Sequence, residues 1–271
     1  ALRPAHFRFS QNLTEGMVTL KDTREPYVFD EGLRMMQVTD AETSQTLGTL
    51  IQWANHPETL WSKNLLISSD FPHYLREAVE KGVYHGDSLV REGVGGVALY
   101  VNGALGGLMT THASMEVHDP FRDTVYVEPS FDKIRAQGDT LGLIILRTME
   151  EKAVEVREAG INLRAKTFEL PLKNKLFRLA AAIGIMDADM TGWMKKRTEA
   201  AAWSIGPAGF ITFPGELYPE ILNGGVVALP GRDFPVDPQE TPPLRDLMQG
   251  EFRFGIGLAN DEVGYIIPKS Q

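Results

Sequence analysis

The chain has 271 residues, a formal net charge of −9 at pH 7 and no cysteine. The acidic balance disfavours nucleic acid as a partner and gives no reason to expect a polybasic membrane-surface patch, because both rely on clustered Lys and Arg. The absence of cysteine excludes disulfides and thiolate metal ligands. No apolar run approaches the roughly 20 residues of a transmembrane helix.

Strand and helix patterns alternate in the N-terminal half. The first 30 residues are polar and rich in turn formers. The near-continuous apolar run at 94–101 is typical of a strand covered on both faces. Pro72 suits the first turn of the helix predicted at 71–81. For the helix predicted at 131–158, Gly160 is the expected C-cap, and the apolar stripe consists of Leu141, Ile144, Ile145, Thr148 and Met149. The predicted elements are strands at 33–38, 46–53 and 94–101, with a hairpin-like connection between the first two, and helices at 71–81 and 131–158.

The C-terminal half continues this alternation without a low-complexity linker or an internal repeat. We therefore predict one α/β domain, residues 1–271, with a mixed central β-sheet flanked by helices. A split near residue 190 is the alternative, but strands on both sides look apolar enough to share a core. The predicted elements are strands at 163–170, 200–205, 208–213, 252–258 and 263–267, helices at 173–185 and 214–222, and a long loop at 223–250.

Three side chains are candidate metal ligands, although each has a simpler explanation. His56 follows the strand that ends at Trp53, and neutral imidazole is a common zinc ligand. Glu216 could be a carboxylate ligand, or an acidic residue that complements the dipole of a helix starting there. Tyr265 could bind a metal as phenolate, or pack as an ordinary strand tyrosine. Each residue taken alone favours the simpler explanation.

The glycine-rich turn at 102–109 lacks both the dinucleotide-binding spacing and a P-loop lysine. Its backbone N–H groups around Gly106 and Gly107 could stabilise an oxyanion, or the turn could be a tight corner. A polar loop at 110–129 offers a second possible metal site, but solvated side chains are the favoured interpretation. Its candidate ligands are His112, His118, Asp119 and Asp123. No G-x-S-x-G elbow supports an α/β-hydrolase triad.

Four blocks, taken together and in order, resemble the N-terminal catalytic domain of the neutral/alkaline (non-lysosomal) ceramidase family. They are ANHPETL at 54–60 with NLLISSD at 64–70, NGALGGLM at 102–109, FITFPGEL at 210–217 and GLANDEVGY at 257–265.

The resemblance implies a single zinc ion held by His56, Glu216 and Tyr265. It places Asp70 and Asn64 beside the site, and we assign Asp70 a catalytic role and Asn64, with Gly106 and Gly107, a role in substrate binding. Members of the family cleave the amide bond of N-acylsphingosine, so the expected substrate is a small or lipid-like molecule. The family also implies an extracytoplasmic location, periplasmic or secreted.

Three departures from the family pattern bear on function. The upstream His-Thr-His-Ser segment, which carries another zinc histidine, has no match here, because His6 has a different context. Met109 stands where the family has a candidate catalytic serine. The C-terminal immunoglobulin-like domain is also unmatched. The resemblance thus implies a catalytic domain that is partial at both ends.

The leading hypothesis is a zinc-dependent hydrolase of an amide or ester bond, with a substrate that need not be ceramide. The alternative is a non-catalytic binding or structural protein on the same scaffold. A phosphate-processing enzyme is a weaker third reading, since no basic residue lies near the glycine-rich turn. The oligomeric state is left open.

Overall fold

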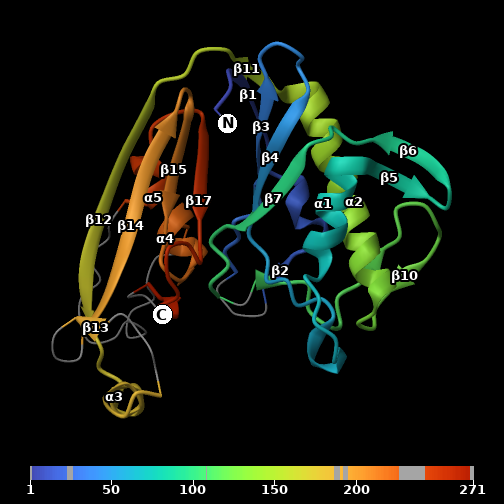
Figure 1. The fold of residues 1–271 in the computed structure, drawn as a ribbon. Helices are drawn as coiled ribbons and strands as arrows, with labels where there is room; N and C mark the ends of the chain where they lie inside the picture. The colour runs from blue at the N-terminus through green and yellow to red at the C-terminus, as the bar shows by residue number, and fades with distance from the viewer. Residues whose placement is uncertain are drawn as a thin grey trace.

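The computed structural model describes residues 2–22, 27–107, 109–185, 190–191, 195–225 and 242–268. Within these ranges the strands form two large mixed sheets, and two long helices cover the outer face of the first sheet (Figure 1). The predicted α/β class with mixed sheets flanked by helices is confirmed. Among the described residues, no helix combines the length and the apolar character that a membrane crossing requires.

The first sheet is built around the predicted hairpin of β3 (Leu33–Asp40) and β4 (Thr46–Trp53). Its strand order is β11-β1-β3-β4-β7, and only the β4–β7 pair is parallel. Strand β1 (Ala5–Asn12) lies in the stretch that the sequence suggested was turn-rich, and it pairs with β3 along its whole length. Side chains alternate between the two faces of each strand, which gives the sheet two apolar faces.

One face of this sheet packs against α1 (Phe71–Lys81) and α2 (Phe131–Lys152). Pro72 occupies the first turn of α1, as predicted, because its missing N–H costs nothing there. In α2 the predicted apolar stripe is buried. Trp53 and Phe71 meet edge to face with ring centroids 5.5 Å apart, which fixes α1 on the end of β4.

The other face packs against the second sheet, whose order is β12-β14-β15-β17. The strands predicted at 200–205 and 208–213 are β14 (Lys195–Ile205) and β15 (Ala208–Thr212), which form a hairpin. Strand β15 pairs in parallel with β17 (Phe252–Ile256). The contact between the sheets is aromatic. Phe9 of the first sheet stacks on Phe252 of the second with centroids 5.5 Å apart. Residues on both sides of position 190 therefore share one apolar cluster.

Shorter elements complete the described chain. Strand β12 (Ile161–Pro171) leads into α3 (Lys175–Ala182), which stands away from both sheets (Figure 1). The others are η1 (Glu15–Thr19), β2 (Lys21–Asp22), η2 (Trp61–Lys63), β5 (Gly82–His85), β6 (Ser88–Glu92), β7 (Val97–Asn102), β8 (Met109–Thr110), β9 (Val117–His118), β10 (Val125–Tyr126), β11 (Val154–Val156), β13 (Met190–Thr191), β16 (Glu216–Leu217), α4 (Pro219–Asn223), α5 (Leu244–Leu247) and β18 (Tyr265–Ile266).

Three predictions about these elements differ from the structure. Helix α2 ends at Lys152 rather than at 158, because Val154–Val156 leaves the helix to pair with β1, and Gly160 is therefore not its cap. Strand β7 is an edge strand whose Val97 and Leu99 are exposed, so it is not covered on both faces. Within the loop predicted at 223–250, residues 226–241 lie outside the described ranges, and α5 is helical.

Candidate functional site

His56 lies just beyond β4, where the chain leaves the first sheet. Its backbone N–H donates to the carbonyl of Met109 over 3.0 Å, and it forms a parallel bridge with Thr110. Met109 itself is fully buried in the core beneath the helices. The Met109 carbonyl therefore helps to hold the histidine backbone, and the Met109 side chain packs in the core.

Glu216 and Tyr265 are brought together by a two-stranded parallel pair. Strand β16 pairs with β18 so that Glu216 lies opposite Tyr265, and the Glu216 N–H donates to the carbonyl of Gly264 over 3.1 Å. The Glu216 carboxylate and the Tyr265 phenol lie close enough to influence each other's pKa. The prediction that a helix starts at 214 is wrong, because this long-range pairing makes the segment a strand and α4 begins only at Pro219.

The imidazole of His56 meets the carboxylate of Glu216, with Nε2 and Oε2 3.4 Å apart. Both atoms are buried, and within the described chain neither has a hydrogen-bond partner. Buried polar atoms are normally satisfied, so such a pair calls for an explanation. Two atoms bound tetrahedrally to one zinc ion at about 2.1 Å lie roughly 3.4 Å apart. The separation and the nitrogen and oxygen donors thus fit a zinc ion.

The electrostatic environment of Glu216 is acidic. Burial raises the pKa of its carboxyl group, the charges of Glu262 and Glu58 raise it further, and His56 opposes them. Burial and the adjacent Glu216 likewise raise the pKa of the Tyr265 phenol. Carboxylates crowded in a partly buried place repel one another, and a cation between them relieves that repulsion. The site is therefore suited to a divalent cation.

No group of three or more His, Asp or Glu side chains that could hold a metal occurs in the part of the chain that the structure describes. The predicted ligand set is not of this kind, because its third member is a tyrosine. The second possible metal site in the loop at 110–129 gains no support. There Asp119 accepts the hydroxyl of Tyr126, and His112 contacts Ser114 and the ring of Trp61.

The glycine-rich turn packs against β16, the strand that carries Glu216. The Gly106 N–H donates to the carbonyl of Leu217 over 2.9 Å, so this N–H is already engaged and cannot also serve a substrate oxyanion. A Cβ on Gly106 would lie 2.7 Å from the carbonyl oxygen of Glu216, which explains why only glycine fits there. Gly107 has φ of +89°, a second backbone reason for glycine. The turn thus positions β16.

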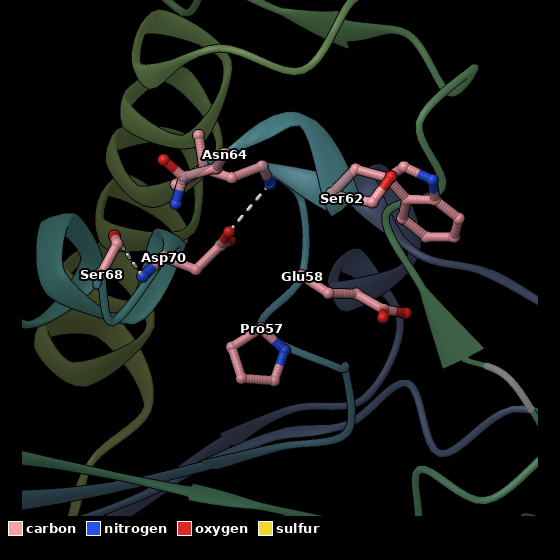
Figure 2. Close-up of a pocket in the computed structure, with 8 residues that line it drawn as sticks. Pro57, Glu58, Ser62, Asn64, Ser68 and Asp70 are labelled. Carbon is pink, nitrogen blue, oxygen red and sulfur yellow. Dashed lines mark hydrogen bonds between the residues drawn. The ribbon is translucent and has the colours of Figure 1, made fainter. Parts of the chain in front are cut away.

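A cleft of about 510 Å³ opens beside His56, on the connection between β4 and α1 (Figure 2). Glu58 lines it and also acts electrostatically on Glu216 and Tyr265, which links the cleft to the candidate metal site. The residues around the cleft are Pro57, Glu58, Leu60, Trp61, Ser62, Asn64, Ser68 and Asp70.

Asp70 lines this cleft, but its carboxylate is directed at the backbone. One oxygen accepts the N–H of Leu60 over 2.9 Å, which is the dashed line at the carboxylate of Asp70 in Figure 2. The other oxygen accepts the N–H of Phe71 over 2.7 Å at the start of α1. The residue is almost fully buried. Asn64 forms a local turn through two hydrogen bonds with Leu66. Both residues thus shape the wall of the cleft, and their assigned roles in catalysis and substrate binding stay predictions.

Sequence reasoning missed three residues near the site. Glu58 and Glu262 are in blocks that carried the resemblance, yet their charges act on Glu216 only because the fold brings these blocks together. Thr110 bridges to His56, and its hydroxyl is buried without a hydrogen-bond partner in the described chain. The sequence signal that could have identified Thr110 was its polar side chain directly after the apolar Met109.

Comparison with solved structures shows the same fold in ceramidases. The neutral ceramidase from Pseudomonas aeruginosa matches with a TM-score of 0.56 and 12% identity, covering 97% of this chain and 46% of that one. A ceramidase in complex with C2 matches with a TM-score of 0.60 and 12% identity, covering 97% and 48%. Comparisons with protein-family models and with curated proteins gave no match. The chain thus has a ceramidase-like fold and spans less than half the length of the solved chains it matches.

Proposed function

We propose that this chain is a zinc-dependent hydrolase of an amide or ester bond with a small-molecule or lipid-like substrate. The observation that carries the proposal is the meeting of His56, Glu216 and Tyr265, which come from distant parts of the sequence. Two of their atoms are 3.4 Å apart, buried and without a hydrogen bond within the described chain. The ceramidase-like fold supports the choice of hydrolase chemistry.

His56, Glu216 and Tyr265 would hold the metal, and the resemblance implies one further histidine ligand from the upstream His-Thr-His-Ser segment, which has no match in this sequence. When bound, zinc would polarise a substrate carbonyl and lower the pKa of water. The protein contributes a fixed geometry: β16 and β18 hold the carboxylate and the phenol in register, and the Met109 carbonyl holds the histidine backbone. Glu58 lines the cleft and acts electrostatically on Glu216, so we propose its carboxylate as the group that accepts a proton.

The alternative is a ceramidase-like protein that binds its ligand without hydrolysing it. Two observations favour this alternative: Met109 is a buried core residue, and the Gly106 N–H is engaged by Leu217. The chain therefore lacks a hydroxyl at the family's serine position and one of the expected oxyanion donors. By resemblance alone, we also propose an extracytoplasmic location for either case.

Zinc content and hydrolysis separate these possibilities. The protein is saturated with zinc, dialysed and assayed for metal by mass spectrometry, and then tested on fluorogenic N-acyl amides and acyl esters. We expect one zinc ion per chain, lost in His56→Ala and Glu216→Gln, together with hydrolysis that is lost in the same variants. The matched control is His73→Ala, which removes an exposed histidine on α1.

A folded wild type that retains no zinc would overturn the metal site. Stoichiometric zinc without hydrolysis of any amide or ester would favour the non-catalytic alternative. If His73→Ala lost zinc as readily as His56→Ala, the binding would be nonspecific.

A further inference from the structure

Helix α3 is an apolar helix without a core to pack against. None of its residues is buried, and five large apolar side chains in and just after it are more than half exposed. They are Leu176 at 75%, Phe177 at 52%, Leu179 at 57%, Ile183 at 59% and Ile185 at 77%. Leu176, Leu179 and Ile183 share one face at helical spacing. Exposed apolar surface of this kind marks a site of interaction.

The charge around this helix is opposite in sign to that of the whole chain. Residues 172–185 contain Lys173, Lys175 and Arg178 and no acidic residue, whereas the chain carries −9. All three basic side chains are exposed. On the helical wheel Lys175 borders the apolar face, and Arg178 lies further round the helix on the same side. An apolar face beside basic side chains on a short helix is the signature of a helix that lies in an anionic membrane interface.

A second apolar segment lies at the same end of the molecule. The connection between β4 and α1 extends to the end where α3 lies (Figure 1), and its Leu65, Leu66 and Ile67 are 94%, 67% and 107% exposed. This connection also carries His56 and lines the cleft. In the view of Figure 1 both apolar segments therefore lie toward the same end of the molecule.

We propose that this end of the molecule, formed by α3 and the loop Leu65–Ile67, docks on an anionic lipid surface. The basic residues would meet the lipid headgroups, and the apolar side chains would enter the boundary with the acyl chains. The acidic remainder of the chain would be repelled by the same surface, which orients the protein. The net charge of the chain gave no reason to expect a basic membrane-surface patch, but the charge relevant to docking is the local one.

Vesicle binding by the full chain tests the proposal without reference to enzymatic activity. Co-sedimentation is measured with vesicles of phosphatidylcholine alone and with vesicles that contain about 30% phosphatidylglycerol, at low and at high salt. We expect binding to the anionic vesicles that weakens with salt, and little binding to the neutral ones.

Two pairs of substitutions separate the electrostatic contribution to vesicle binding from the apolar contribution. Lys173→Gln with Lys175→Gln should weaken binding on the order of twentyfold, at about fivefold for each charge. Phe177→Ser with Leu179→Ser should weaken it about tenfold or more. The positions are exposed, so the variants should fold. The matched control, Lys152→Gln with Arg157→Gln, removes two exposed charges near β11, at the opposite end of the molecule, and should leave binding unchanged (Figure 1).

The proposal is overturned if the chain fails to bind anionic vesicles, or if the control pair weakens binding as much as the α3 pairs do. It is also overturned if the wild type does not bind vesicles and instead sediments as a dimer, and if Phe177→Ser with Leu179→Ser converts this dimer to a monomer. The apolar face would then be covered by a second copy of the chain.

Discussion

Removing the Asp70 side chain should destabilise the fold. Asp70→Ala eliminates the N-cap of α1, worth about 1 kcal/mol. It also leaves the buried N–H of Leu60 without its acceptor, which costs about 1–3 kcal/mol. The free energy of unfolding should therefore fall by about 2–4 kcal/mol, and Tm by roughly 5–10 °C.

The backbone of Asp70 sharpens this expectation. Its φ of +57° is a conformation that costs non-glycine residues about 1–3 kcal/mol. Asp70→Gly loses the same hydrogen bonds but relieves the strain, so it should destabilise by about 1 kcal/mol less than Asp70→Ala. Urea unfolding measures the free energy for both variants, with the exposed Asp123→Ala as a control that should stay within about 0.5 kcal/mol of the wild type.

Two results would refute this reasoning. If Asp70→Gly were the more destabilised variant, the backbone strain would not matter. If Asp70→Ala kept the stability of the wild type and lost only hydrolysis, Asp70 would be a catalytic residue, as the resemblance implies, and its hydrogen bonds would be incidental.

Three further substitutions test the core, the turn and a buried charge. Phe9→Ala removes a fully buried ring between the sheets and should cost about 3–5 kcal/mol in urea unfolding; a loss under 1 kcal/mol would mean that the sheets do not share this core. Gly106→Ala should displace Glu216 and weaken zinc binding at least tenfold by titration calorimetry, whereas Gly160→Ala, where a Cβ meets nothing within 4 Å, should leave affinity unchanged. Equal affinities in the two variants would contradict the positioning role of the turn. Burial raises the pKa of Asp139 to about 6 from 3.8, so the folded state holds its proton more tightly than the unfolded chain, and its contribution to stability falls as pH rises through that window. The raised pKa corresponds to roughly 3 kcal/mol of lost stability at high pH, which we reduce to about 1 kcal/mol because the side chain is partly exposed. Asp139→Asn should therefore stabilise the protein by about 1 kcal/mol at pH 8, and this gain should shrink towards pH 4. The same effect at both pH values in urea unfolding would contradict the reasoning.

Local sequence patterns predicted those elements whose own residues show a clear apolar spacing or a characteristic terminal residue. The hairpin of β3 and β4 and the helix at Phe71–Lys81 follow from apolar spacing and from Pro72 in the first turn. Strand β1 had a signal as well, since Phe7 and Phe9 alternate with polar residues, but the turn formers around it hid that alternation.

Long-range pairing explains what the sequence could not show. Val154–Val156 continues a helical pattern and becomes a strand only because β1 lies beside it. Glu216 looks like the first turn of a helix and is a strand residue because it pairs with Tyr265. The candidate ligands were found through resemblance rather than spacing. The structure brings their side chains together, and their role as zinc ligands stays a prediction.

The most direct test of the metal centre is a crystal structure of the zinc-soaked protein with anomalous diffraction data collected on both sides of the zinc edge. We predict one anomalous peak at about 2.0–2.2 Å from His56 Nε2, a Glu216 carboxylate oxygen and the Tyr265 hydroxyl oxygen. A map with no peak among these three side chains, or with its peak at another place in the molecule, would contradict the proposed zinc site.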